Sequence, residues 1–193
     1  MARIAYLKTP RTKGYITLGL LSEGGNIAYT VPRITYSEIG SPVRGDEIGE
    51  DTVVRLARED ELFRAERRAL SILSYADNSE RMLRMKLSRL GFSREAIAHA
   101  VKTAVGNGYI DEERQLRIKI SELANIKLRG RYYILEYLRG RGYDIGLVSE
   151  VIDKLSDEGE IDFQASFERL AEKKGTRARE EKLTLLKKYG YRK

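Results

Sequence analysis

The chain lacks several residues on which common kinds of chemistry depend. Its 193 residues include no cysteine, no tryptophan and a single histidine, His99. Disulfides, thiol nucleophiles and Cys/His zinc sites are therefore excluded, and a Ser-His-Asp triad would have to use His99 alone. No apolar run approaches the roughly 18 to 20 residues that span a bilayer, and no signal peptide is visible at the N-terminus. We expect a cytoplasmic protein that does not contact membranes.

The charge balance favours a polyanionic partner. Lysine and arginine number 36 against 29 aspartates and glutamates, so the formal net charge is +7. Such a balance is typical of proteins that bind nucleic acid or something that carries it. A basic surface that only aids solubility explains the same number equally well.

Proline is confined to the start of the chain, where the pattern is that of β-structure. The three prolines are Pro10, Pro32 and Pro42. The runs 15–21 and 26–31 are rich in β-formers and flank two glycines that can take the positive φ of a tight turn, which predicts a hairpin. From about Asp51 onward the apolar spacing is helical.

An internal repeat organises the helical part. Gly91 and Gly142 lie 51 positions apart and mark two copies of the repeat. A third copy is indicated by Gly190, which matches Gly142 at an offset of 48. At the first offset further residues of like class coincide: Leu83 with Ile134, Leu87 with Leu138, Phe92 with Tyr143, Ile97 with Val148, Val101 with Ile152, Gly108 with Gly159, and Asp111 with Asp162. Repeats of this length indicate stacked helical units.

The predicted fold is mainly α: an elongated array of tandem three-helix repeats, the third incomplete, with a small N-terminal β-hairpin region. We place the β-rich region at 1–55 and the repeats at 56–110, 111–160 and 161–193. In the first repeat we expect helices over about 61–76, 79–90 and 93–105. Ser79, Ser93 and Asp111 are the expected N-caps, and Gly91 the glycine that ends a helix.

No residue pattern supports catalysis. The carboxylates beginning at Asp111 and Asp157 lie at helix ends, where they cap amides or face water, and His99 has no visible partner. A magnesium-dependent nuclease that uses Asp111 or Asp162 remains an alternative. We expect no catalytic residue, no metal and no cofactor.

Basic residues recur in the same element of each repeat and form the candidate binding face. If the repeats stack, this face could hold phosphates in a salt-dependent manner. The alternative is a solvated helix face whose cations pair with nearby glutamates. The candidate residues are Arg81, Arg84, Lys86, Arg89, Arg94, Lys127, Arg129, Arg131, Arg139, Arg141, Lys174, Arg177, Arg179, Lys187 and Lys188.

Three tyrosines accompany these cations. Tyr132, Tyr133 and Tyr137 could stack on bases. Tyr133 and Tyr137 are four residues apart, however, so a buried stripe of the helix explains them more simply.

The motifs of the helical part resemble the RecX family of regulatory proteins. They are the stretch RALSILSYADNSE from Arg68, the pattern Leu83 to Ser93, and the stretch GYIDEER from Gly108. The resemblance covers about residues 60–190, and the β-rich start is similar to the N-terminal extension of RecX proteins from Gram-positive bacteria. The sequence departs from the family pattern at Gln115-Leu116, where the family has Phe-Ala. It also departs in the third repeat, which stops about one helix early.

The resemblance implies a non-enzymatic modulator of the RecA recombinase. RecX proteins are elongated, curved arrays of three-helix repeats that bind the RecA–single-stranded DNA filament. They block its extension or promote its disassembly, and so limit ATP hydrolysis, strand exchange and co-protease action. The expected partners are the RecA filament and single-stranded DNA, with double-stranded DNA also reached through phosphates, and we expect a monomer. The alternative is a stand-alone DNA-binding regulator whose helix pairs act as helix-turn-helix units.

Overall fold

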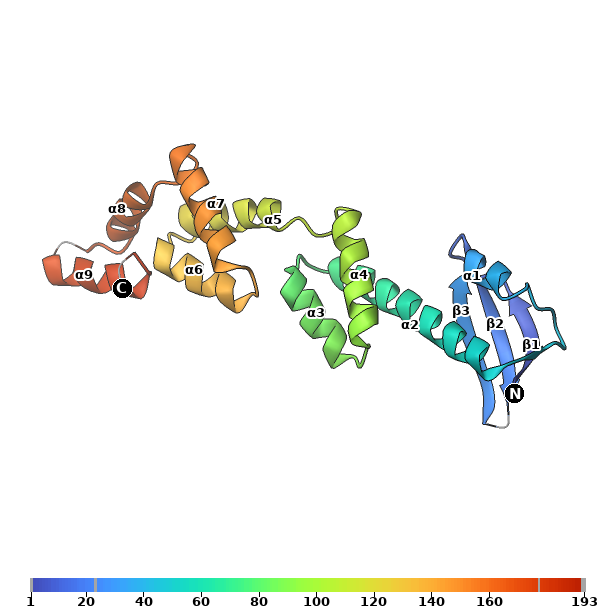
Figure 1. Cartoon of the computed structure of the whole chain (residues 1–193). Coiled ribbons are helices and arrows are strands. Elements are labelled where there is room, and N and C mark those ends of the chain that lie inside the picture. The colour runs from blue at the N-terminus through green and yellow to red at the C-terminus, as the bar shows by residue number, and fades with distance from the viewer. Residues whose placement is uncertain (1, 23, 177, 192–193) are drawn as a thin grey trace. The chain divides into compact units, whose positions relative to one another are not determined.

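The computed structural model describes residues 2–22, 24–176 and 178–191 (Figure 1). It divides into two compact units. In their described parts, the first comprises Met1–Ile72 and Lys86–Ala104, and the second comprises Leu73–Met85 and Val105–Lys193.

A four-stranded antiparallel sheet forms the start of the first unit, in the order β3-β2-β1-β4. The strands are β1 (Ala2–Lys8), β2 (Tyr15–Ser22), β3 (Gly25–Pro32) and β4 (Glu47–Ile48), and α1 (Arg33–Glu38) follows β3. The predicted hairpin of β2 and β3 is confirmed. Sequence reasoning missed β1, β4 and α1. Strand β4 has only two residues, too few to show a periodic pattern, and α1 has only six.

Helix α2 (Glu50–Leu73) is anchored on this sheet (Figure 1). Its buried Leu56 belongs to the apolar cluster of the sheet. One turn later the buried Asp60 accepts a hydrogen bond from the Thr30 amide of the edge strand β3 (2.8 Å). The predicted start near residue 61 is wrong, because burial against the sheet continues the helix back to Glu50.

Helical hairpins make up the rest of the described chain. The elements are α3 (Glu80–Arg89), α4 (Arg94–Gly106), α5 (Glu112–Ser121), the π-helix η1 (Glu122–Ile126), α6 (Arg131–Gly140), α7 (Ile145–Asp157), α8 (Phe163–Lys173) and α9 (Arg179–Lys188). The predicted caps are confirmed: the side chains of Ser79, Ser93 and Asp111 accept hydrogen bonds from backbone amides in the first turns of α3, α4 and α5.

The internal repeat is present in the backbone. Gly91, Gly142 and Gly190 have φ values of 84°, 84° and 76°, the left-handed region that glycine enters without strain. The residue after each glycine is aromatic, and its amide donates a hydrogen bond to the carbonyl of the residue five positions earlier. The N···O distances are 3.5, 3.2 and 2.9 Å for Phe92, Tyr143 and Tyr191. The same helix end is thus built three times, as the glycine spacing predicts.

Two of these glycine turns dock on the N-terminus of an earlier helix, within the second unit. The Ser79 hydroxyl at the start of α3 donates to the Arg141 carbonyl (2.9 Å), beside Gly142. At the start of α6, the Gly130 amide donates to the Tyr189 carbonyl (2.8 Å), beside Gly190. Ser79 and Gly130 are equivalent positions of the repeat, so both contacts join one repeat to the next in the same way.

The docked turns are too close to admit a larger residue. A Cβ atom at Gly142 would lie 2.8 Å from the Ser79 hydroxyl, and one at Gly130 would lie 2.3 Å from the Tyr191 amide nitrogen. Both distances are shorter than van der Waals contact, so the absence of a side chain is a condition of this contact.

The tyrosines that follow Gly142 and Gly190 differ in their polar partners. The Tyr143 hydroxyl donates to the buried Gln115 amide oxygen (2.8 Å). The Tyr191 hydroxyl is buried without a hydrogen-bond partner among the described residues, and the ring lies against Phe163 and Phe167. Burial raises the pKa of both phenols to about 12.

We predict that Gly142→Ala destabilises the protein by about 2 kcal/mol, because alanine at a positive φ is strained and its Cβ meets Ser79. The matched control is Gly140→Ala, two residues earlier, where a Cβ meets nothing within 4 Å. Urea unfolding followed by circular dichroism measures both. Equal stability of the two variants would contradict the docking described here.

A second pair of variants tests the tyrosine hydroxyls. Tyr143→Phe leaves the buried Gln115 side chain without its partner and should cost about 1 to 2 kcal/mol. Tyr191→Phe removes a buried hydroxyl that has no partner and should be neutral or stabilising. The same unfolding measurement separates the variants, and a larger loss for Tyr191→Phe would show that this hydroxyl is in fact satisfied.

Candidate nucleic-acid interface

Arg129 lies between two tyrosine rings just before α6. Its guanidinium carbon is 4.4 Å from the centre of the Tyr133 ring and 4.7 Å from the centre of the Tyr189 ring. Both distances are in the range of a cation–π contact. Tyr189 reaches this place because its carbonyl accepts the Gly130 amide in the docked turn.

The stack continues along α6. Tyr133 and Tyr137 are one helical turn apart, and their rings are stacked with centres 6.0 Å apart and an interplanar angle of 13°. The Arg141 guanidinium carbon lies 5.0 Å from the centre of the Tyr137 ring. We call this surface the α6 face: Arg129, Tyr133, Tyr137, Arg141 and Tyr189.

A cavity of about 320 Å³ opens beside the α6 face. Arg129, Tyr133 and Tyr137 form one wall, and Lys119, Glu122, Leu123 and Lys127 complete the lining. Lys119 pairs with Asp77 (3.0 Å), and Lys127 lies 3.7 Å from Glu122. Aromatic faces next to cations are the arrangement that proteins use to hold bases and phosphates of a single strand.

The expectation that Tyr133 and Tyr137 form a buried stripe of α6 is wrong. The buried residues of α6 are Ile134 and Leu138, and 36% of Tyr137 is exposed. The buried positions of α6 are thus the residues directly after the two tyrosines, so the tyrosine side chains are turned away from the core. Sequence reasoning also missed Tyr189, because its approach to Arg129 depends on the docked turn rather than on any local pattern.

Three predicted basic residues gather around a second cavity. Arg81, Arg84 and Arg139 line a space of about 530 Å³ together with acidic residues that include Glu80 and Glu112. Arg84 lies 3.6 Å from Glu80, and Arg139 pairs with Glu136 (2.5 Å). Burial raises the pKa of Glu112, although the Glu80 amide donates a hydrogen bond to its carboxylate. This cavity is therefore of mixed charge.

The remaining predicted cations are dispersed. Arg131 binds Asp153 through both guanidinium ends (2.6 and 3.2 Å), and these hydrogen bonds lower the pKa of the Asp153 carboxyl. Lys86, Arg89 and Arg94 belong to the first unit. Lys174, Arg179, Lys187 and Lys188 are exposed around α8 and α9, and Arg177 lies outside the described residues.

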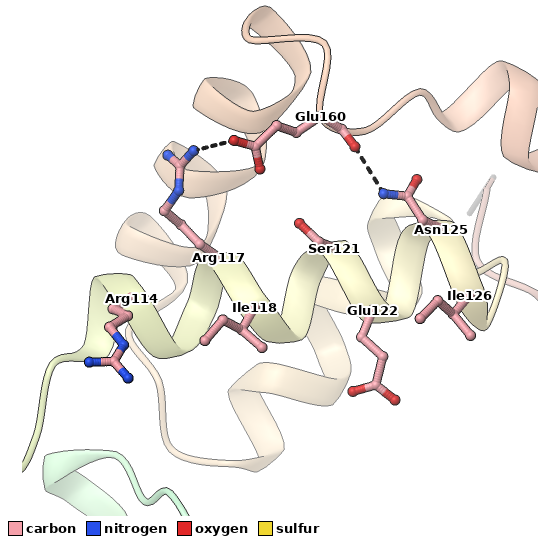
Figure 2. A pocket seen from close by; sticks show the side chains of 8 residues that line it. All are labelled: Arg114, Arg117, Ile118, Ser121, Glu122, Asn125, Ile126 and Glu160. Atoms are coloured by element: carbon pink, nitrogen blue, oxygen red, sulfur yellow. Dashed lines mark hydrogen bonds and ion pairs between the residues drawn. The ribbon is translucent and has the colours of Figure 1, made fainter.

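The largest of the cavities described here, about 750 Å³, follows α5 and η1 and is mainly apolar. Figure 2 shows Arg117 and Asn125 both reaching Glu160, while Ile118 and Ile126 lie on the other side of the same helix. The two isoleucines are 59% and 71% exposed. Because Arg117 is bound to the Glu160 carboxylate and Asn125 to the Glu160 carbonyl, this groove offers mainly apolar contact.

The residues considered for catalysis have structural partners. Asp111 caps α5 and Asp162 caps α8, each accepting backbone amides within 3.0 Å. The His99 Nε2 lies 2.8 Å from a Glu66 carboxylate oxygen. Among the residues that the structure describes, no three histidine, aspartate or glutamate side chains are grouped so that they could hold a metal ion. Nor, in that part of the chain, is any helix long and apolar enough to cross a bilayer.

Comparison with known proteins gives relatives of one kind. No family model matches the chain. Regulatory protein RecX of Limosilactobacillus reuteri (strain DSM 20016) is 23% identical over 173 residues, which cover 90% of this chain but only 63% of that protein, so the chain spans less than two thirds of the relative's length. Regulatory protein RecX of Caldanaerobacter subterraneus subsp. tengcongensis is 29% identical over 169 residues, 86% of this chain and 82% of that protein.

A solved structure has the same fold. The crystal structure of a regulatory protein RecX superposes with a TM-score of 0.71 at 19% sequence identity, covering 98% of this chain and 93% of the other. The described chain, with its helices and small N-terminal antiparallel sheet, is therefore mainly α, as the sequence predicts.

We predict that Arg129→Lys lowers the free energy of unfolding by about 1 kcal/mol, because an ammonium group cannot overlie both tyrosine rings as the planar guanidinium does. Lys127→Arg is the control, since Lys127 is exposed and contacts Glu122 only at 3.7 Å. Urea unfolding reports both changes. Unchanged stability of Arg129→Lys would mean that the stack contributes nothing to holding Tyr189.

Proposed function

We propose that this chain, which is similar in sequence to regulatory proteins RecX, regulates the RecA recombinase by binding the RecA–single-stranded DNA filament. The relatives that match it along most of its length are named regulatory proteins RecX. The observation that carries the proposal to this chain is the α6 face, where stacked tyrosines and guanidinium groups stand at the surface.

The chemistry of the α6 face suits the DNA of such a filament. Each base stacked on an aromatic ring contributes about 1 to 3 kcal/mol without regard to sequence, as a regulator of filaments on any strand requires. The Arg129 guanidinium contacts the rings of Tyr133 and Tyr189, and it forms no ion pair among the described residues. A guanidinium group donates hydrogen bonds to phosphate oxygens, and such contacts make the binding dependent on salt.

Inhibition follows if the protein binds one state of the filament better than another. A ligand can shift a filament between growing, ATP-hydrolysing and disassembling states only by its difference in affinity for them. We propose that binding of this chain limits ATP hydrolysis, strand exchange and co-protease action together. No step of this proposal requires catalysis, in keeping with the structural roles of His99, Asp111 and Asp162.

We predict that the protein inhibits single-stranded-DNA-dependent ATP hydrolysis by the cognate RecA below one molecule per recombinase subunit. Tyr137→Leu should raise the concentration for half-inhibition at least about fivefold, since one stacking surface is lost. Tyr75→Leu is the matched control, because Tyr75 is 88% exposed and lies outside the α6 face.

Three results would overturn parts of the proposal. Absence of inhibition by the folded wild-type protein at equimolar concentration would rule out the filament as its target. Sequence-specific binding to duplex DNA without recombinase would favour the helix-turn-helix alternative. Equal loss in Tyr137→Leu and Tyr75→Leu would remove the α6 face from the mechanism while leaving the target intact.

A further inference from the structure

We propose that a groove on α2, in the first compact unit, is an additional binding site for single-stranded nucleic acid. The groove has a volume of about 560 Å³. Its lining consists of three arginines and a serine of α2, with apolar side chains from α2 and the turn between α3 and α4: Arg64, Arg67, Arg68, Ser71, Phe63, Leu90 and Phe92. None of these arginines is among the cations that the repeat pattern singled out, because the repeat comparison concerned later helices.

The groove carries positive charge that the protein does not neutralise. Arg67 and Arg68 are exposed, and neither forms an ion pair with the described residues. Arg64 pairs with Asp60 (2.8 Å), but Asp60 is also bonded to the edge strand and does not line the groove. The lining contains no acidic side chain. An anionic ligand is therefore the chemistry that complements this surface.

Two acidic residues of α2, Glu61 and Glu66, are held by contacts with α4 and with the residue just before it. Glu61 accepts hydrogen bonds from the Ser93 amide and hydroxyl, both at 2.8 Å. Glu66 accepts from the Thr103 hydroxyl (3.1 Å) and contacts His99. These contacts fix the turn that carries Phe92 beside α2. Neither of these glutamates forms an ion pair with Arg67 or Arg68 in the described part of the chain.

The spacing of the groups favours a nucleic acid strand over an acidic peptide. Arg64 and Arg68 are one turn apart, about 6 Å along the helix axis, and Arg67 lies on the same side, so adjacent phosphates can each meet a guanidinium. Phe63 and Phe92 offer aromatic surface next to these cations, and Leu90 is 49% exposed. Bases of a single strand cover such surface, whereas the carboxylates of an acidic peptide would leave it in contact with water.

This inference rests on the proposed function only for the choice of DNA as the nucleic acid. The binding itself requires no recombinase, so the test uses the full-length chain with DNA alone. The probe is a fluorescent oligothymidylate, titrated by anisotropy at several salt concentrations. Circular dichroism and thermal unfolding establish that each variant is folded.

We expect Arg67→Glu with Arg68→Glu to weaken oligothymidylate binding at least about tenfold at low salt. The slope of log affinity against log salt should become shallower by about 1.4, which corresponds to two lost phosphate contacts on a single strand. Arg68→Glu alone should show a smaller loss in the same direction. Its matched control is Arg44→Glu, an exposed arginine in the loop before β4, which should bind almost as the wild type does.

The outcomes separate this site from the proposed function. Wild-type affinity and salt slope in the folded double variant would overturn the inference, even if the protein inhibits RecA. If the double variant loses ATPase inhibition but binds oligothymidylate normally, the groove meets protein and not DNA, which also overturns it. Failure of the wild type to inhibit RecA, with the expected DNA result, would overturn the proposed function alone.

Discussion

The contact on which the second compact unit depends is the docking of a glycine turn on the N-terminus of an earlier helix. Gly142 lies against Ser79 at the start of α3, and Gly190 lies against Gly130 at the start of α6. Each docked turn supplies carbonyl oxygens to donors at a helix start, where backbone amides have no partner within the helix. The close approach leaves no room for a Cβ atom, so the backbone of the glycine turn itself meets the start of the earlier helix.

The candidate DNA-binding surface is a consequence of that docking. Because the Tyr189 carbonyl accepts the Gly130 amide, the Tyr189 ring is brought over the guanidinium of Arg129. Arg129 then contacts two rings. The Tyr133 ring stacks on the Tyr137 ring, which in turn contacts the Arg141 guanidinium. A surface that could serve as a stacking platform is thus built by the same contact that joins the second and third repeats.

The two compact units deal with their charges in a similar way. In the first, the acidic groups of α2 bind β3 and α4, which leaves Arg67 and Arg68 unpaired among the described residues. In the second, four of the predicted cations are bound to carboxylates, as Arg131 is to Asp153, whereas Arg129 and Arg141 contact tyrosine rings. Local pairing, and not the number of basic residues, decides where positive charge is available to a ligand.

The sequence by itself determined the repeat and its helix ends, and it carries the resemblance to regulatory proteins RecX. Glycines at an offset of 51, the caps Ser79, Ser93 and Asp111, and the hairpin at 15–31 are local signals, because each depends on the φ preference or hydrogen bonding of one residue. Tertiary structure decided the rest. It extended α2 to Glu50 by burying Leu56, turned Tyr133 and Tyr137 outward by burying Ile134 and Leu138, and selected which arginines remain unpaired. These outcomes depend on contacts between residues far apart in the chain, which periodicity cannot reveal.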